Sequence, residues 1–137
     1  GVSNHQIHHL KQIIEDTGVV PAVNQVECHP LLTQKELLRF CQQEGIQLEA
    51  WSPLIRGNLN SEILLNLADK YGKTPAQIIL RWDIQNEIVT IPKSVRKERI
   101  IENSQIFDFQ LSPEDMQIID SMNENKRLGP HPDQVNF

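Results

Sequence analysis

Hydrophobic positions along the chain alternate between two spacings, which predicts helices and strands in turn. Over residues 4–17 the apolar side chains recur every three or four positions, the spacing of one helix face. The segment after it, residues 19–27, is β-branched and typical of a strand. The same reasoning predicts helices at 33–44, 61–71, 75–86 and 96–107, a last helix opening at Ser112, and strands at 46–51 and 87–92.

This order of elements predicts an α/β fold built from parallel βαβ units with right-handed crossovers. Three strands are too few for a stable parallel sheet, because both edges and one apolar face would stay uncovered. We therefore expect residues 1–137 to form a partial single domain that belongs to a larger sheet or barrel, with 126–137 as a loop-like tail. Gly1 in place of methionine also suggests that the chain is processed or is a piece of a longer one.

The composition of the chain limits the kinds of partner that it is expected to bind. A net charge of −5 argues against nucleic acid or an anionic membrane as the main partner, since both require a positive field. No apolar run approaches the roughly 20 residues of a membrane span, and no segment resembles a signal peptide. Cys28 and Cys41 form no CxxC pair or dense disulfide pattern. We expect reduced, packed thiols in a cytoplasmic protein.

Polar side chains follow the predicted strands where each one ends. The carboxyl ends of parallel strands line the ligand site in α/β folds. Helix capping is the alternative, because Ser and Asn are also favoured at helix N-termini. The residues concerned are Gln25 and Glu27, Trp51 and Ser52, Lys93 and Ser94, and Ser3 and Asn4, which would follow a strand upstream of the chain.

The stretch IPKSVRKERIIEN, residues 91–103, places cations at the wrong end of a helix. A helix N-terminus carries a partial positive charge and favours anions. Lys93, Ser94 and Arg99 together with free backbone N–H groups would suit a bound phosphate. The alternative is a solvated basic surface, which costs only about a few tenths of a kcal/mol per charge. Energy alone leaves both interpretations open.

Several motifs in a fixed order carry a family resemblance: GVSN at 1–4, NQVECHPLL at 24–32, AWSPLIRGN at 50–58, IPKS at 91–94, RIIEN at 99–103 and FQLSPEDM at 109–116. In this order they resemble the second half of an aldo-keto reductase. The tail LGPHPDQVNF resembles the short-tailed bacterial branch of 2,5-diketo-gluconate and glyoxal or methylglyoxal reductases. The resemblance implies the second half of a TIM (β/α)8 barrel, with three to four parallel strands and flanking helices, and NADPH as cofactor. The family binds it without a glycine-rich Rossmann loop, and this chain has no GxGxxG.

The resemblance also implies roles for single residues. The nicotinamide carboxamide would be held by Ser3, Asn4 and Gln25, and Trp51 would stack on its ring. Ser52, Leu54 and the loop through Arg56 and Asn58 would run beside the pyrophosphate, with Ile55 standing where several relatives have glycine. The 2′-phosphate would be held by Lys93, Ser94 and Arg99, and the adenine by Glu102 and Asn103.

The family's catalytic Asp, Tyr, Lys and His match nothing in this chain. Tyr71, the single tyrosine, falls late in a predicted helix and is expected to be a packing or surface residue. A TIM barrel takes about 250 residues. We therefore expect the cofactor half of a reductase of small carbonyl substrates, inactive without its N-terminal half. The alternatives are a non-catalytic nicotinamide-binding regulatory module and a fragment that reassembles with another copy.

Three other patterns in the sequence have both a functional and a structural interpretation. His5 with His8 or His9 could share a helix face and bind zinc, but no acidic or cysteine ligand is evident nearby, so we expect no metal site. Cys28 and His29 are adjacent on a strand and point to opposite faces, which favours a core cysteine and a structural histidine over a nucleophilic pair. Trp82 is expected to pack in the outer helical layer.

Overall fold

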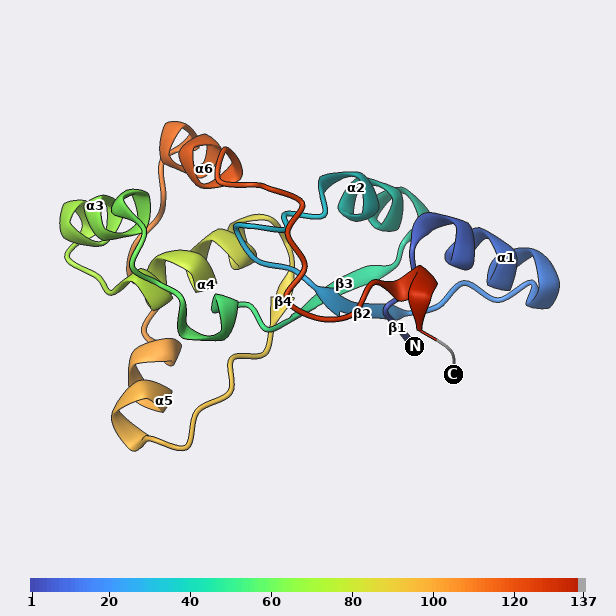
Figure 1. Ribbon diagram of the computed structural model, residues 1–137, viewed down its shortest axis with the longest axis horizontal. Coiled ribbons are helices and arrows are strands. Elements are labelled where there is room, and N and C mark those ends of the chain that lie inside the picture. The colour runs from blue at the N-terminus through green and yellow to red at the C-terminus, as the bar shows by residue number, and fades with distance from the viewer. Residues whose placement is uncertain (136–137) are drawn as a thin grey trace.

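Four parallel strands lie at the centre of the computed structural model, which describes residues 1–135 (Figure 1). They are β1 (Val2–Ser3), β2 (Val23–Glu27), β3 (Gln47–Trp51) and β4 (Val89–Thr90), hydrogen-bonded in the order β1-β2-β3-β4. The predicted α/β class, with three to four parallel strands and flanking helices, is confirmed. One detail was wrong: the strand before Asn4 is not wholly upstream, because Val2 and Ser3 pair with Asn24 and Gln25.

Helices α1 (Ile7–Thr17) and α2 (Lys35–Glu44) pack against the strands. Each ends at a glycine with a left-handed backbone, Gly18 at φ 68° and Gly45 at φ 73°, a conformation that glycine adopts without steric cost. Their shared core with the strands consists of Leu10, Val26, Cys28, Leu37, Leu38, Cys41, Ile46, Leu48, Ala50 and Ile88.

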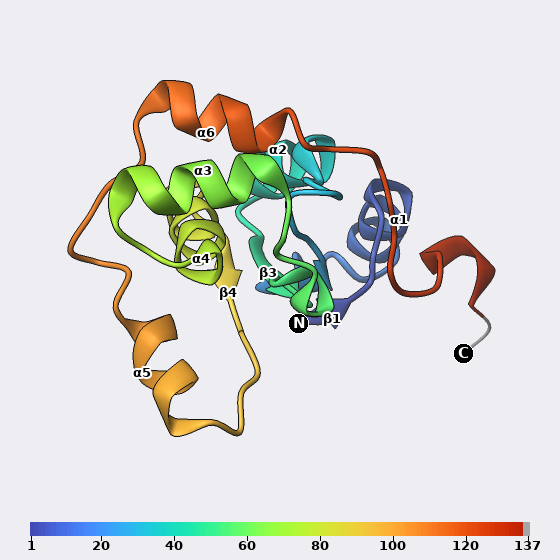
Figure 2. The ribbon, with the colours of Figure 1, turned by 60° about the vertical axis from the view of Figure 1, so that its left-hand side comes forward.

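A second core forms among α3 (Glu62–Tyr71), α4 (Pro75–Gln85) and α6 (Pro113–Asp120). Figure 2 shows α3 and α6 side by side with α4 behind them, and the helix contacts agree. Trp82 is fully buried in this core, and its Nε1 donates a 2.9 Å hydrogen bond to Oδ1 of Asp120. The predicted packing role of Trp82 is confirmed.

Helix α5 (Lys97–Ser104) stands apart from the other helices in both views (Figures 1 and 2). None of its residues is buried, and Nε2 of Gln77 in α4 donates to the backbone oxygen of Glu102 at 2.9 Å. The predicted helix at 96–107 was too long at its C-terminal end, because the chain leaves the helix at Gln105 and buries Ile106.

Other predicted boundaries also needed correction. The helix at 4–17 begins only at Ile7, since Asn4 takes a left-handed backbone at φ 55°. The strand at 19–27 begins at Val23, after Pro21, which has no N–H for the ladder. The strand at 87–92 keeps two paired residues, and the helix at 33–44 begins at Lys35.

The tail after α6 crosses from the helical core to the start of α1 (Figures 1 and 2). It is not continuous loop, because it contains the 3-10 helix η2 (Pro132–Gln134). The predicted tail at 126–137 lies within the described residues as far as Val135. Over residues 1–135, no helix combines the length and apolar character needed to cross a membrane.

Candidate functional site

Two neighbouring strands present polar side chains on one face of the sheet. The register pairs Gln25 with Glu49 and Glu27 with Trp51, so these four side chains share a face. The alternate residues Val26, Leu48 and Ala50 point the other way, into the core beneath α1 and α2. The alternation that folds the sheet therefore also gathers the polar ends predicted from the sequence.

Trp51 is held by the residue that follows β1. Its indole Nε1 donates a 2.8 Å hydrogen bond to Oδ1 of Asn4, and the backbone N–H of Asn4 donates to Gln25 O at 2.8 Å. The left-handed backbone of Asn4 turns the chain so that both bonds form. The side chain of Gln25 is itself fixed, because its Nε2 donates to Oε1 of Glu49 at 2.6 Å. Ser3 is exposed beside this group.

A cleft of about 680 Å³ opens directly after Trp51. It lies between the segment following β3, the start of α4 and the connection from β4 into α5. Eight of the twelve residues predicted to bind the cofactor line it, namely Ser52, Leu54, Arg56, Lys93, Ser94, Arg99, Glu102 and Asn103. Of the other four, Asn4, Gln25 and Trp51 form the hydrogen-bonded group described above, and Ser3 lies beside it.

Two cations, Lys93 and Arg99, lie at the α5 end of this cleft. Lys93 and Arg99 line both the cleft and a smaller hollow of about 210 Å³ beside it. Within residues 1–135, neither makes an ion pair, whereas Lys35, Lys70 and Lys73 each pair with an aspartate. The N–H of Arg96 donates to Oγ of Ser94 at 3.1 Å, which folds the chain tightly into the helix start. Lys93 and Arg99 are thus without an ion-pair partner in residues 1–135, although the carboxylate of Glu102 lines the same cleft.

The chain after β3 runs through a strained 3-10 turn, η1 (Ile55–Gly57). Ile55 and Arg56 have φ values of 54° and 53°, in the left-handed region that β-branched residues avoid. Ile55 is only 2% exposed and packs into the helical core, which offsets the strain. Arg56 is exposed at the cleft. Ile55, at the position where several relatives have glycine, thus adopts the same kind of turn at the cost of a strained backbone.

Sequence reasoning missed part of the cleft wall and overreached at one position. Thr74, Pro75 and Ala76, at the start of α4, line the cleft. The Thr74-Pro75 pair marked a helix start in the sequence, but its nearness to β4 depends on how α4 folds back. Asn58, placed beside the pyrophosphate by the resemblance, does not line the cleft.

Cys28 and His29 diverge, as the strand alternation predicted. Cys28 is fully buried, burial raises the pKa of its thiol well above the ordinary value, and Sγ contacts the backbone oxygen of Thr33 at 3.7 Å. His29 turns to Glu27 instead, with Nε2 2.7 Å from Oε2. A protonated thiol apart from the imidazole cannot act as an activated nucleophile. The pair is structural.

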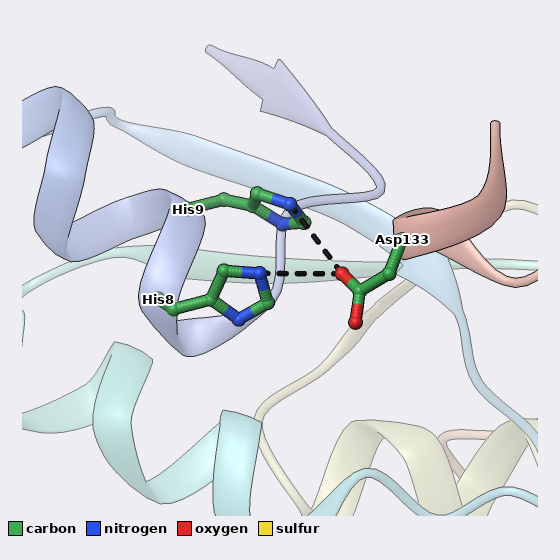
Figure 3. Close-up of side chains that lie close together, drawn as sticks. All are labelled: His8, His9 and Asp133. Atoms are coloured by element: carbon green, nitrogen blue, oxygen red, sulfur yellow. Dashed lines mark ion pairs between the residues drawn. The ribbon is translucent and has the colours of Figure 1, made fainter. Parts of the chain in front are cut away.

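The histidines at the start of α1 have an acidic neighbour after all. Asp133 of η2 lies with Oδ1 3.2 Å from Nε2 of His8 and 3.5 Å from Nε2 of His9 (Figure 3). The expectation that no acidic group lies nearby was therefore wrong, because the tail supplies one from more than a hundred residues away. The three ligand atoms lie within 4.8 Å of one another.

The hydrogen bonds of His9 nevertheless oppose metal binding there. Its Nδ1 accepts the backbone N–H of Gln6 at 3.0 Å, closing a capping box at the start of α1. A neutral ring that accepts at Nδ1 carries its proton on Nε2, so that atom donates to Asp133 and offers no lone pair to a metal. Burial, with help from His8, lowers the pKa of His9, which keeps the ring neutral.

The single tyrosine of the chain packs among the helices. Tyr71, the single tyrosine, lies in α3, where its hydroxyl contacts Asp115 and accepts the N–H of Ser112 at 3.0 Å. Its ring packs against Phe109 with centroids 5.8 Å apart. The predicted packing role of Tyr71 is confirmed.

Comparison with known proteins agrees with this geometry. The model of the aldo/keto reductase family matches residues 1–124. The glyoxal reductase of Bacillus subtilis (strain 168) is 56% identical over the whole chain, and methylglyoxal reductase DkgA of Escherichia coli (strain K12) is 47% identical over 98% of it. This chain belongs to the aldo/keto reductase family. It spans about half the length of these curated relatives, covering 50% of each.

A solved structure matches the same extent. A mutant of Gox0644 in complex with NADPH superposes over the full chain with a TM-score of 0.95 and 42% identity, and the match covers 51% of that protein. The four strands and their helices are therefore part of an aldo-keto reductase barrel.

Proposed function

We propose that this chain supplies the cofactor-binding half of an NADPH-dependent reductase that converts aldehydes or ketones to alcohols. One observation carries the proposal: Lys93 and Arg99, which form no ion pair within residues 1–135, line a cleft that also includes Ser52, the residue directly after Trp51. NADPH is a long anion with an extra phosphate at its adenosine end and a flat nicotinamide ring at the other. This shape matches a cleft with cations at one end and an aromatic side chain near the other.

The basic end would bind the 2′-phosphate of the cofactor. Lys93 supplies a point charge, Arg99 a bidentate fork and the first turn of α5 its partial positive charge and backbone N–H groups. Bound phosphate would convert the unfavourable crowding of cations at the helix start into an attraction. Glu102 and Asn103, one turn further along α5, also line the cleft and would contact the adenine.

The aromatic end would hold the nicotinamide. Trp51 offers a flat ring whose edge is fixed by Asn4, and ring stacking needs only such a flat surface. Ser3, Asn4 and Gln25 lie around that edge and would bind the carboxamide. Between the two ends, Ser52, Leu54 and Arg56 line the cleft where the pyrophosphate would pass.

The proton donor of the reaction would come from outside this chain. Carbonyl reduction needs an acid next to the carbon that accepts the hydride, and Tyr71, the single tyrosine, packs among the helices instead. The parent protein would join this half to the other half of the barrel, which would contribute the acid and most of the carbonyl pocket. The names of the relatives, glyoxal and methylglyoxal reductase, support small carbonyl substrates. Buried free thiols at Cys28 and Cys41 support a reducing, cytoplasmic setting.

Tryptophan fluorescence tests the proposal. NADPH should quench the emission of the chain through Trp51, and NADH should do so much more weakly. Trp51→Phe should remove the quenching while Trp82, buried in the helical core, continues to emit. Equal quenching by the two cofactors would remove the role given to Arg99. We also expect negligible aldehyde reduction by this chain, and robust NADPH oxidation with an aldehyde would show that an acid has been overlooked.

A further inference from the structure

Glu27 binds the tail to the end of the sheet. It is the last residue of β2, is 1% exposed, and lies more than a hundred residues before its partners. Its Oε2 accepts the backbone N–H of Leu128 at 2.6 Å and its Oε1 accepts that of Gly129 at 2.9 Å. His29 completes the set through Nε2, 2.7 Å from Oε2. We call these four residues, Glu27, His29, Leu128 and Gly129, the tail clasp.

The clasp works only with an ionised carboxylate. Burial alone would raise the pKa of Glu27, but the N–H groups of Leu128 and Gly129 and the His29 ring outweigh it, so the pKa lies below its ordinary value. Burial lowers the pKa of His29, so its ring is neutral, with the proton on the nitrogen that faces Glu27. Its Nδ1 is buried and has no partner in the described residues. Three donors thus converge on one acceptor.

The tail clasp holds the tail backbone in contact with Trp51. A methyl group on the α-carbon of Gly129 would lie 2.5 Å from Cη2 of Trp51 and 3.2 Å from Oε1 of Glu27. Real side chains are never that close, so the backbone of Gly129 packs directly against the indole. The register explains the contact, because Glu27 and Trp51 are partners across β2 and β3.

The indole is therefore fixed at two points, which come from opposite ends of the chain. Asn4 holds Nε1 by a hydrogen bond, and Gly129 covers the far edge of the ring. A second, weaker attachment lies further along the tail, where exposed Asp133 meets His8 and His9. The tail is thus anchored on both sides of its contact with Trp51.

We propose that Glu27 is a positioning residue: through the tail backbone at Leu128 and Gly129 it sets the orientation of the Trp51 ring on which the nicotinamide would stack. This inference rests on the proposed function only for its consequence in cofactor binding. The orientation of the ring can be measured without any cofactor.

The test compares Glu27→Gln, Gly129→Ala and the double variant with Glu124→Gln, an exposed tail carboxylate, as the matched control. Glutamine places an amide donor against a backbone donor, so one of the tail bonds is lost. We expect amide exchange at Leu128 and Gly129 to accelerate roughly tenfold or more in Glu27→Gln, and the near-ultraviolet dichroism of the indole to change in both single variants. The affinity for NADPH should fall about three- to tenfold in each, and by no more in the double variant, because both act on one contact. Glu124→Gln should leave all three readings unchanged.

Two results would overturn the proposal. Faster tail exchange in Glu27→Gln without a change in the indole signal would mean that Glu27 anchors the tail and nothing more. Additive losses of affinity in the double variant would mean that the two residues act separately. Should Glu27→Gln fail to fold, Gly129→Ala decides alone, since it leaves the carboxylate intact and an unchanged indole signal would refute the contact. A wild-type chain that does not bind NADPH would refute the proposed function. The near-ultraviolet dichroism of the indole would still decide the role of Glu27.

Discussion

The indole nitrogen of Trp51 donates to the amide oxygen of Asn4 across the ends of β3 and β1, a 2.8 Å hydrogen bond between residues 47 positions apart. The ring of Trp51 is suited to stacking on a flat ligand, and the amide of Asn4 is suited to hydrogen bonding with a carboxamide. The bond uses Oδ1 of Asn4, and within residues 1–135 its Nδ2 donates no hydrogen bond, so that donor is available to a ligand. If the proposed function holds, this geometry would orient the nicotinamide end before the cofactor binds.

Removing this bond should weaken NADPH binding without abolishing it. Trp51→Tyr keeps a flat ring but loses the Nε1 donor, and a neutral hydrogen bond is worth about 0.5–1.5 kcal/mol. We expect NADPH affinity to fall about three- to tenfold, measured by calorimetry because the tryptophan reporter is gone. Asn4→Ala should cost a similar amount alone and little more in the Trp51→Tyr background. Full additivity of the two losses would show that the bond does not matter.

Relief of backbone strain should separate stability from binding at Arg56. Its φ of 53° costs a non-glycine residue roughly 1–2 kcal/mol, and its side chain is exposed. Arg56→Gly should therefore raise the midpoint of urea unfolding while lowering NADPH affinity, because a cleft-lining cation is lost. Glu87→Gly is the matched control: φ is 58°, the residue is exposed and it does not line the cleft. It should stabilise the chain and leave binding unchanged. A destabilised Arg56→Gly would show that the turn is not strained.

Asp83 should make the chain less stable as the pH rises. Its carboxyl is fully buried, and burial raises its pKa well above 3.8, opposed only in part by the nearby Thr90 hydroxyl. Neither carboxyl oxygen has a hydrogen-bond partner of ordinary geometry among the described residues. A raised pKa means that the folded state holds its proton where the unfolded state has lost it. Stability is therefore fully present below about pH 4 and falls as pH rises towards the raised pKa, by about 1.4 kcal/mol per pH unit.

Asp83→Asn tests that sign, because asparagine has a similar shape and no proton to lose. The variant should match the wild type in thermal unfolding near pH 4 and exceed it at pH 8. Glu98→Gln, on the exposed surface of α5, should show no such divergence. A variant that is less stable than the wild type at pH 8 would mean that Asp83 is ionised and paired.

Local signals in the sequence predicted most elements of the fold. Proline after threonine is typical of a helix start and glycine of a helix end, and Thr74-Pro75 and Gly45 stand at the start of α4 and the end of α2. Two-residue strands gave no periodic pattern, so β1 was missed and β4 was drawn too long. The left-handed turn at Asn4 was also invisible, since asparagine signals a turn and a helix cap equally well.

In the candidate site, too, some residues could be predicted from local sequence signals and others could not. Cleft residues such as Ser52, Lys93 and Ser94 follow strand ends and could be placed by chain order alone. The contacts of the tail could not, because the bonds from Glu27 to Leu128 and Gly129 join positions about a hundred residues apart. Nothing local to Glu27 distinguishes a carboxylate that binds a tail from one that faces a ligand.

The most direct test of the account is the ratio of dissociation constants for NADH and NADPH, measured in the wild type, in Arg99→Ala and in Lys97→Ala. Lys97 is an exposed cation in the first turn of the same helix and does not line the cleft, so it controls for general charge. We predict that Arg99→Ala weakens NADPH binding by roughly 10- to 100-fold, the loss of one charged hydrogen-bonded contact, and leaves NADH binding unchanged. Lys97→Ala should change the ratio little. An Arg99→Ala chain that still prefers NADPH as strongly as the wild type would contradict the assignment of the basic end of the cleft to the 2′-phosphate.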